Sequence, residues 1–428
     1  MKTLILAYAC EPGAGSESGV GWLVPTIMAK RHPEHEIYVL TRSRYREKII
    51  ATLDSLLARE GNGGLTNIHF LFYEIPSCLL YKDEKGSNWG EQYNYLLWQW
   101  FAKGFIKKQN KNIGFDVIHH LTFNQYRTPS PGFFINVPFV MGPIGGAESI
   151  ADAFYQDLSE HTAKKECFRK KGYDLKLFGW WAKAKNNKKI ILCSTKENVK
   201  RLKPHCGDNE CKLMPAIAYT PEDFAHLTTD GLNKIDSYSP FTLIYAGRAI
   251  DWKGIRIFLR AAKRAYIDNG ITDFLIKLIG IRSEQEQQMV MGWVKEEQLT
   301  DNVELIPFIA RADLLKELAK CNLSVYPAFR DSGSMSVLEA SALACPTICF
   351  DAGGQDAFPD EILLKVKVDG TYEDIMRRFA LQLQMAYNDP ATTRAIGLKA
   401  KEYVSRELVW EKKVDDFVTI YEEITNPS

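Results

Sequence analysis

Short apolar runs alternate with helical stretches along nearly the whole chain, and this alternation limits the fold more than any single motif. One series of runs lies at residues 4–9, 37–40, 68–73, 117–120, 139–141 and 190–194. A second series lies at residues 241–246, 275–279, 303–307, 323–327 and 347–350, with helices expected between them. This order is typical of parallel sheets whose strands are joined by helices. The sequence therefore predicts an α/β protein with two Rossmann-like domains.

The length of the chain agrees with two domains. Its 428 residues, of which 46% are hydrophobic, are enough for two separate cores. The two series of strands meet near an extended stretch between Pro215 and Pro221. We therefore expect domains at residues 1–215 and 216–428. A long amphipathic helix is expected at residues 409–424.

Composition excludes several classes of protein. A net charge of +1 argues against a dedicated nucleic-acid binder. The nine cysteines form no C-x-x-C pair, so a zinc site is not expected and a reducing compartment is the simplest interpretation. The apolar start could be mistaken for a short lipoprotein signal, but Glu11 and Pro12 follow at once, which favours a buried first strand. No apolar stretch is long enough to span a membrane.

The segment at residues 330–346 combines small residues with acidic ones. Gly333 permits a tight turn, and Ser334 or Ser336 could cap the helix that follows. The free amide groups at such a helix start bind anions. Glu339 lies among apolar residues, where an ionised side chain needs partners. A phosphate-binding helix start beside a carboxylate suits a nucleotide diphosphate and its ribose; the alternative is a core helix whose one charge reaches solvent.

This segment resembles the signature of the retaining glycosyltransferases of family 4 (glycosyl transferases group 1), which have the GT-B fold. That signature is two acids separated by seven residues, then a small-residue helix and a proline. The chain keeps the spacing from Asp331 to Glu339, with Asp where the family usually has Glu. The shorter side chain moves the first carboxylate by about 1.5 Å. By resemblance, Glu339 holds the donor ribose and Asp331 faces the donor sugar. The same resemblance places the nucleotide against Gly333, Ser334, Met335, Ser336, Val337 and Leu338.

A second motif follows the first strand of the second half. Gly247, Arg248 and Lys253 lie directly after the apolar run at residues 241–246, at the strand edge where open α/β sheets bind ligands. Two cations there suit a diphosphate, whose charge grows as it departs. The resemblance gives Arg248 and Lys253 that role. The alternative is a solvated loop.

A glycine-rich loop links the first strand to its helix. Glycines at this point let the backbone approach a ligand and leave the first helix amides free. Any Rossmann-like protein could carry such a turn. By resemblance, Gly19 and Gly21 are candidates for donor binding, and Glu17 is a candidate contact for the acceptor or sugar.

Two further strand ends carry candidate residues. His119 and His120 end the run at residues 117–120, where related enzymes place a sugar-facing histidine. Adjacent strand residues face opposite sides, so only one of them can reach the cleft without a bulge. We take His120 as a catalytic candidate and His119 as a weaker acceptor or sugar contact. Gly145 and Gly146 border the same cleft, unless they form a plain turn.

Two regions combine basic and aromatic side chains. Residues 164–189 hold ten Lys or Arg against two acids, and residues 89–105 are rich in aromatics and precede Lys107 and Lys108. One interpretation is a solvated helix face over core aromatics. The other is contact with an anionic membrane surface.

We therefore expect a GT-B enzyme that moves a hexosyl group from a nucleotide-diphosphate sugar to a glycan or lipid-linked hydroxyl acceptor. Its deep interdomain cleft would hold the site, and residues 405–428 would cross back to the first domain. The resemblance implies retention, and cell-surface polysaccharide or glycolipid biosynthesis in the cytoplasm or at the inner face of the membrane. No cofactor or metal is expected, because the chain contains no Asp-x-Asp. The alternatives are a nucleotide-sugar epimerase-like enzyme and a non-catalytic nucleotide-sugar-binding protein of a polysaccharide assembly.

Overall fold

The first half of the chain forms a parallel sheet flanked by helices. The computed structural model describes residues 1–60, 65–81, 88–172, 188–206, 211–225, 227 and 240–425. Within these residues the first sheet has seven strands in the order β3-β2-β1-β4-β5-β6-β7. The strands are β1 (Lys2–Ala7), β2 (Glu36–Arg42), β3 (Ile68–Tyr73), β4 (Val117–Thr122), β5 (Phe139–Ile144), β6 (Lys189–Cys193) and β7 (Cys211–Leu213). The helices of this half are α1 (Ser16–Arg31), α2 (Arg46–Glu60), α3 (Asn88–Ile113), α4 (Glu160–Lys170) and α6 (Lys196–Cys206).

The second half repeats this plan. Its described residues form six strands in the order β10-β9-β8-β11-β12-β13. The strands are β8 (Phe241–Ala246), β9 (Phe274–Ile281), β10 (Val303–Pro307), β11 (Leu323–Tyr326), β12 (Thr347–Phe350) and β13 (Leu364–Val366). The helices are α7 (Glu222–Ala225) in the linker, then α8 (Ile255–Ala265), α9 (Glu284–Glu296), α10 (Arg311–Leu318), α11 (Met335–Ala342), α12 (Tyr372–Asn388), α13 (Pro390–Glu407) and α14 (Trp410–Thr425).

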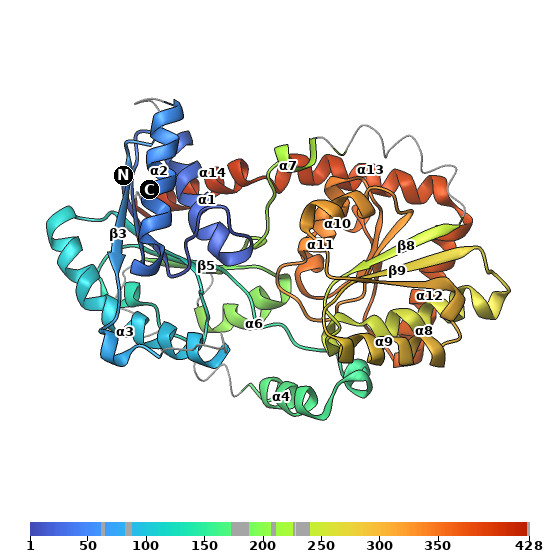
Figure 1. Ribbon diagram of the computed structural model, residues 1–428. Helices are drawn as coiled ribbons and strands as arrows, with labels where there is room; N and C mark the ends of the chain where they lie inside the picture. The colour runs from blue at the N-terminus through green and yellow to red at the C-terminus, as the bar shows by residue number, and fades with distance from the viewer. Residues whose placement is uncertain are drawn as a thin grey trace.

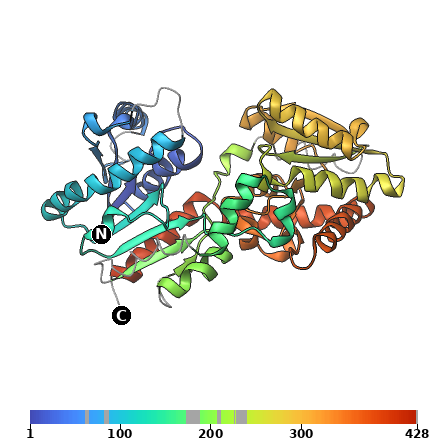
Figure 2. The same ribbon diagram turned by 90° about the horizontal axis from the view of Figure 1, so that it is seen from below.

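The predicted α/β architecture with two parallel sheets is confirmed, and Figures 1 and 2 show the two halves side by side. The central apolar runs form the predicted strands because they are buried between helices; β1 is fully buried from Thr3 to Ala7, whereas the edge strands β3 and β10 are only partly buried. In both sheets the first strand of the half lies in the interior, with later strands added on either side. The carboxyl ends of the central strands therefore meet at one edge of each sheet, where ligands of such folds bind.

The last helix crosses from the second half to the first. α14 packs against α1 (Figure 1). Its residues Trp410, Phe417 and Tyr421 are part of the buried core of the first sheet. Lys413 on the same helix is 4% exposed and donates hydrogen bonds to the carbonyl oxygens of Pro215 and Ile217 in the linker. α14 therefore packs against the first domain and also forms hydrogen bonds with the segment that joins the two domains.

A second segment crosses in the opposite direction. Residues 147–170, which we call the strap, follow β5 and reach the second domain (Figure 2). Phe154 is fully buried in the core of the second sheet, with its ring 4.6 Å from that of Phe329 and 5.0 Å from that of Phe350. Farther along, Asp157 pairs with Arg260 at 2.7 Å. The strap therefore contributes a core residue to the other domain.

Candidate functional site

The largest concentration of predicted site residues lies in a cleft of about 680 Å³ between the two domains. The first domain lines it with the β1–α1 loop and with residues that follow β4 and β5, and the linker forms one wall. The second domain contributes residues from the loop after β11 and from α11. Predicted residues among the lining are Glu17, Gly19, Gly145, Gly333, Met335 and Glu339.

Asp331 and Lys253 form an ion pair beside the cleft. Lys253 also donates to the Tyr326 hydroxyl at 3.1 Å, and that hydroxyl donates to Asp331. The amide of Gly333 approaches the second Asp331 oxygen at 3.4 Å. Burial alone would raise the pKa of Asp331, but Lys253 and the hydrogen bonds hold it below its usual value. Asp331 is thus a carboxylate held in a fixed orientation, and its partner Lys253 can also pair with a second anionic group.

Glu339 on α11 faces the cleft with a partner that the sequence did not reveal. Its Oε1 lies 2.7 Å from Nε of Arg311 at the start of α10, and its side chain is 6% exposed. Arg311 also pairs with Asp223 of the linker at 3.0 Å. Burial raises the pKa of Glu339, while Arg311 opposes that rise. The outcome is a buried carboxylate in a fixed position on the cleft wall.

The start of α11 differs from the prediction in one respect. Ser334 occupies the position before the helix, but its φ of 44° is left-handed and its hydroxyl makes no capping bond. Instead the hydroxyl donates to Gln355 at 2.9 Å, and Ser336 donates to the Ala246 carbonyl at 3.2 Å. The expectation that Ser334 or Ser336 caps the helix is therefore wrong. No side chain of the described residues caps α11; the amides of Val337 and Leu338 donate to the Ser334 carbonyl, so an anion could meet only the amides that precede them.

The other predicted residues of α11 divide into two groups. Met335 is 40% exposed and lines the cleft. Val337 and Leu338 are fully buried in the core beneath the helix. Their side chains therefore position α11, and only their backbone could meet a ligand.

The loop after β8 carries Arg248 in an exposed position. Arg248 makes no side-chain hydrogen bond or ion pair with any residue that the structure describes, while its carbonyl accepts from Tyr245 at 2.9 Å. A side chain at Gly247 would press against the Tyr245 hydroxyl. Gly254, with φ of 70°, lies against the carbonyl of Pro327, so a side chain there would collide with it. These close approaches fix the loop that carries Arg248 and Lys253.

The glycines of the β1–α1 loop have a packing role. A Cβ at Gly19 would collide with the Ala14 carbonyl, and a Cβ at Gly21 would collide with the Ala9 carbonyl. Gly19 lines the cleft, whereas Gly21 is buried against the end of β1. Glu17 is exposed and lines the cleft from the first domain. The loop thus brings the start of α1 to the cleft wall.

The two histidines of β4 face different surroundings. His119 is fully buried: Tyr421 of α14 donates to its Nδ1 at 2.5 Å, and its Nε2 donates to the Gly142 carbonyl at 2.8 Å. It therefore does not reach the cleft, because both ring nitrogens hold α14 and β5 in place. His120 is also fully buried and donates from Nε2 to the Thr122 carbonyl at 3.1 Å, which leaves Nδ1 without a partner among the described residues.

The loop after β5 touches the signature loop of the second domain. The Gly146 amide donates to the Ser332 hydroxyl at 3.2 Å and to Glu148 at 2.8 Å. A Cβ at Gly145 would collide with the Ser332 side chain. Next to Ser332 in this loop, Arg330 pairs with Glu166 of the strap, which is 1% exposed. The glycines at 145 and 146 therefore form a contact between domains at one end of the cleft.

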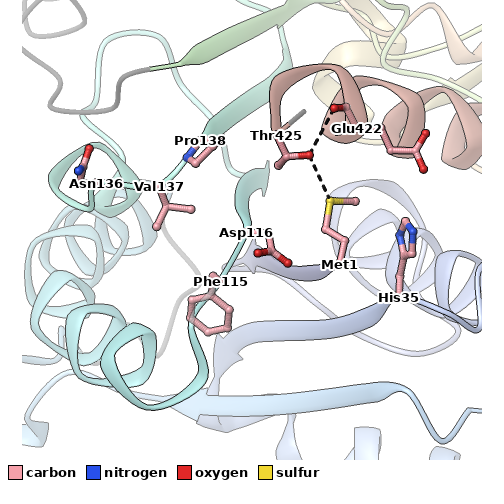
Figure 3. A pocket seen from close by; sticks show the side chains of 9 residues that line it. All are labelled: Met1, His35, Phe115, Asp116, Asn136, Val137, Pro138, Glu422 and Thr425. Atoms are coloured by element: carbon pink, nitrogen blue, oxygen red, sulfur yellow. Dashed lines mark hydrogen bonds between the residues drawn. The ribbon is translucent and has the colours of Figure 1, made fainter. Parts of the chain in front are cut away.

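A second cavity of about 600 Å³ lies at the opposite edge of the first sheet (Figure 3). Its residues precede the strands instead of following them: Met1 before β1, His35 before β2, Asp116 before β4 and Pro138 before β5. Glu422 and Thr425 of α14 close one side. None of the predicted site residues lines this cavity.

Sequence reasoning did not find four residues of the cleft region: Arg311, Tyr326, Asp223 and Ser332. Arg311 and Tyr326 lie close to the carboxyl ends of β10 and β11, so their position after or at the end of an apolar run was a usable signal. Asp223 and Ser332 lie in connecting segments, whose partners cannot be predicted without the fold. Among the described residues, no group of three or more His, Cys, Asp or Glu is arranged to hold a metal. No helix of the described residues is long and apolar enough to cross a membrane.

Comparison with known proteins agrees with this geometry. Residues 234–358 match the family described as glycosyl transferases group 1. D-inositol 3-phosphate glycosyltransferase of Paenarthrobacter aurescens is 22% identical over 183 residues, which are 43% of this chain and 44% of that protein. The same enzyme of Pseudarthrobacter chlorophenolicus is 24% identical over 160 residues, 37% of each chain. The chain thus matches less than half the length of these curated relatives.

Solved structures resemble the whole chain. Sucrose-phosphate synthase from Thermosynechococcus elongatus has a TM-score of 0.63 at 16% identity, with 100% of both chains covered. Anabaena HepE in complex with UDP has a TM-score of 0.57 at 13% identity, covering 98% of this chain and 100% of that one. WaaG, a glycosyltransferase of lipopolysaccharide biosynthesis, has a TM-score of 0.56 at 13% identity, covering 97% and 99%. The chain therefore has the GT-B fold, and the region at residues 234–358 is similar to the glycosyl transferases group 1 family.

Proposed function

We propose that the protein is a retaining glycosyltransferase that moves a hexosyl group from a nucleotide-diphosphate sugar to a hydroxyl acceptor. The observation that carries this proposal is Glu339, a buried carboxylate held by Arg311 on the cleft wall, beside the uncapped start of α11. The family match and the names of both curated relatives support glycosyl transfer. The UDP complexes of HepE support a nucleotide-sugar donor.

The second domain would bind the donor. Glu339 would accept hydrogen bonds from the ribose hydroxyls, and the amides at the start of α11 would meet the diphosphate. Arg248 and Lys253 would stabilise the charge that the diphosphate gains as the sugar–phosphate bond breaks. Asp331, oriented by Lys253 and Tyr326, would accept hydrogen bonds from sugar hydroxyls. These residues supply positive charge to the leaving group, and the proposal calls for no metal or cofactor.

The first domain would bind the acceptor. Glu17 and Gly145 line the cleft opposite α11, so an acceptor hydroxyl entering between the domains would meet the donor sugar there. His120, neutral because burial lowers its pKa, could not supply positive charge and would instead help organise the sugar or acceptor. A glycan or a lipid-linked sugar fits this role, and we place the reaction in cell-surface polysaccharide or glycolipid biosynthesis.

The test begins with thermal-shift screening against UDP- and GDP-sugars, followed by assays of nucleotide release with and without a glycan acceptor. Release that depends on an acceptor would support transfer. Conversion of the donor sugar without an acceptor would point to an epimerase, and binding without turnover would point to a non-catalytic protein.

The variant Arg248→Ala tests the proposed role of Arg248 at the departing diphosphate. Loss of one preorganised cation at the leaving group should reduce turnover at saturating donor by about 10²–10³-fold. Arg264→Ala, which removes a partly exposed Arg paired with Glu373 on α12, is the control and should leave turnover unchanged. Turnover near the wild-type value in Arg248→Ala would overturn its assignment.

A further inference from the structure

The outer face of α3 carries a stripe of exposed aromatic and aliphatic side chains. Tyr93 is 36% exposed, Leu96 51% and Trp100 69%. These positions are three and four residues apart, so they lie on one face of the helix. Phe101 is 36% exposed at the border of this stripe. Single exposed hydrophobic residues are common, but four on one helix form a contiguous apolar surface.

The same stripe continues as a basic surface. Lys107 and Lys111 follow Trp100 at helical spacing and are exposed, with Lys108 beside them. Lys103 lies between the two parts, with its ammonium 4.0 Å from the ring centre of Phe134 and 5.9 Å from that of Trp100. From residue 92 to residue 113 the sequence contains four lysines and no acid. The face therefore has an apolar half and a positive half. Together they extend about 27 Å along the helix, from Tyr93 to Lys111.

The opposite face of α3 is anchored in the first domain. Tyr95, Trp98 and Ala102 are fully buried, and Ile106 is 1% exposed. The exposed stripe is thus part of a rigid element, and α3 runs along the border of the first domain (Figure 1). It does not need to unfold or rotate to present both halves to a flat surface.

The other basic–aromatic region differs in the residues that the structure describes. Part of it, residues 173–187, lies outside the described residues. On α4, Lys164 pairs with Glu160 at 2.5 Å and Lys170 pairs with Asp152. Arg169 is buried beside Glu166. The charges of α4 are therefore largely matched by acids, whereas the lysines of α3 form no ion pair with an acid in the part of the chain that the structure describes.

We propose that the outer face of α3 binds the surface of an anionic lipid bilayer. The lysines at 107, 108 and 111 would meet acidic headgroups, and the ring of Trp100 with Leu96 and Tyr93 would enter the interface between headgroups and acyl chains. A helix lying flat on a membrane needs this combination of a rigid apolar stripe and unmatched positive charge. The proposal does not depend on sugar transfer.

The test uses the full-length protein and sedimentation with vesicles. The wild type should sediment with vesicles of phosphatidylcholine and phosphatidylglycerol, and not with vesicles of phosphatidylcholine alone. The triple variant Lys107→Gln, Lys108→Gln, Lys111→Gln should lower partitioning by at least about tenfold, since each lysine contributes to attraction near the surface. At raised salt the attraction between the lysines and the acidic headgroups is screened, so the binding that remains comes mainly from the apolar side chains. Trp100→Ala should therefore weaken vesicle binding at high salt.

The matched control removes the same number of charges from α4 and the residue that follows it: Lys164→Gln, Lys165→Gln, Lys171→Gln. All three lysines are exposed. This control should bind vesicles like the wild type, and every variant should melt at the wild-type temperature. Equal binding by wild type and the α3 triple variant, loss of binding in the α4 variant alone, or no binding by the wild type would each overturn the proposal. Binding to duplex DNA that the α3 variant loses, without vesicle binding, would reassign the face to nucleic acid.

Discussion

Arg311 is the first residue of α10, Glu339 lies in the middle of the neighbouring helix α11, and the two side chains meet at 2.7 Å on the wall of the interdomain cleft. The arginine also pairs with Asp223 of the linker, so the carboxylate is connected to the segment between the domains. Because Glu339 is buried, a charged carboxylate there depends on Arg311. The pair keeps the Glu339 carboxylate, a hydrogen-bond acceptor, oriented before any ligand enters.

Replacing Glu339 with Gln should weaken nucleoside diphosphate binding. The substitution keeps the volume but removes charge-assisted hydrogen bonds worth about 1.5–3 kcal/mol, so the affinity should fall by about one to two decades. Calorimetric titration with UDP and GDP measures this. Glu296→Gln, which changes an exposed acid paired with Arg256, is the control. An unchanged affinity would mean that Glu339 only holds Arg311.

Removing the ring of Phe154 should destabilise the second domain, although this residue belongs to the first half of the chain. Its ring packs between Phe329 and Phe350, and Phe→Ala changes at such sites cost about 3–5 kcal/mol. The midpoint of denaturant unfolding, followed by fluorescence, measures the loss. Phe168→Ala on α4 is the matched control, since that ring is 53% exposed and its removal should change stability by less than about 0.5 kcal/mol.

The histidines of β4 should make the protein less stable in mild acid. Burial lowers the pKa of His119 to about 4 and that of His120 to about 3, from an ordinary value of 6.5. The unfolded chain therefore binds protons that the folded chain excludes. The stabilisation is complete above about pH 6.5 and declines as the pH falls toward 4, by up to about 1.4 kcal/mol per pH unit for each ring. Melting temperatures from about pH 7.5 to 5 should fall less steeply in His119→Gln, and parallel curves would contradict this.

A methyl group at Gly145 should disturb the contact between the domains. Gly145→Ala would collide with Ser332, so we expect turnover to fall while the melting temperature changes little. Ser332→Gly in the same chain creates room for the methyl group and should restore most of the turnover. The double-mutant comparison separates this contact from a general loss of folding. Failure of Ser332→Gly to rescue would show that the collision lies elsewhere.

The apolar runs predicted the strands well, both for central strands buried on both faces, such as β12, and for the partly buried edge strands β3 and β10. The bounds of β3, β8, β10 and β12 agree with the predicted ranges residue for residue. The strands β7 and β13 were missed because each has only three residues, too few to show a pattern. The prediction for α14 differs by one residue at each end, since its amphipathic stripe is long.

The partners of the site residues could not be predicted in the same way. Lys253 and Asp331 are 78 residues apart and meet only because β8 and β11 are neighbours in the sheet. Ser334 was expected to cap α11 by its residue type, but the left-handed backbone directs its hydroxyl to Gln355. Residue type and spacing indicate which groups are present, whereas strand order and local backbone decide which groups meet.

The strap and α14 cross between the domains in opposite directions, and this exchange constrains how the protein could be re-engineered. A chimaera joined at the linker, with a donor domain taken from a relative, would carry Phe154 into a core that was not shaped for it. It would also place a foreign last helix against α1 and His119. To exchange the second domain while keeping the first, the strap and the residues around Phe329 and Phe350 should be exchanged together, and α14 should stay with the first domain.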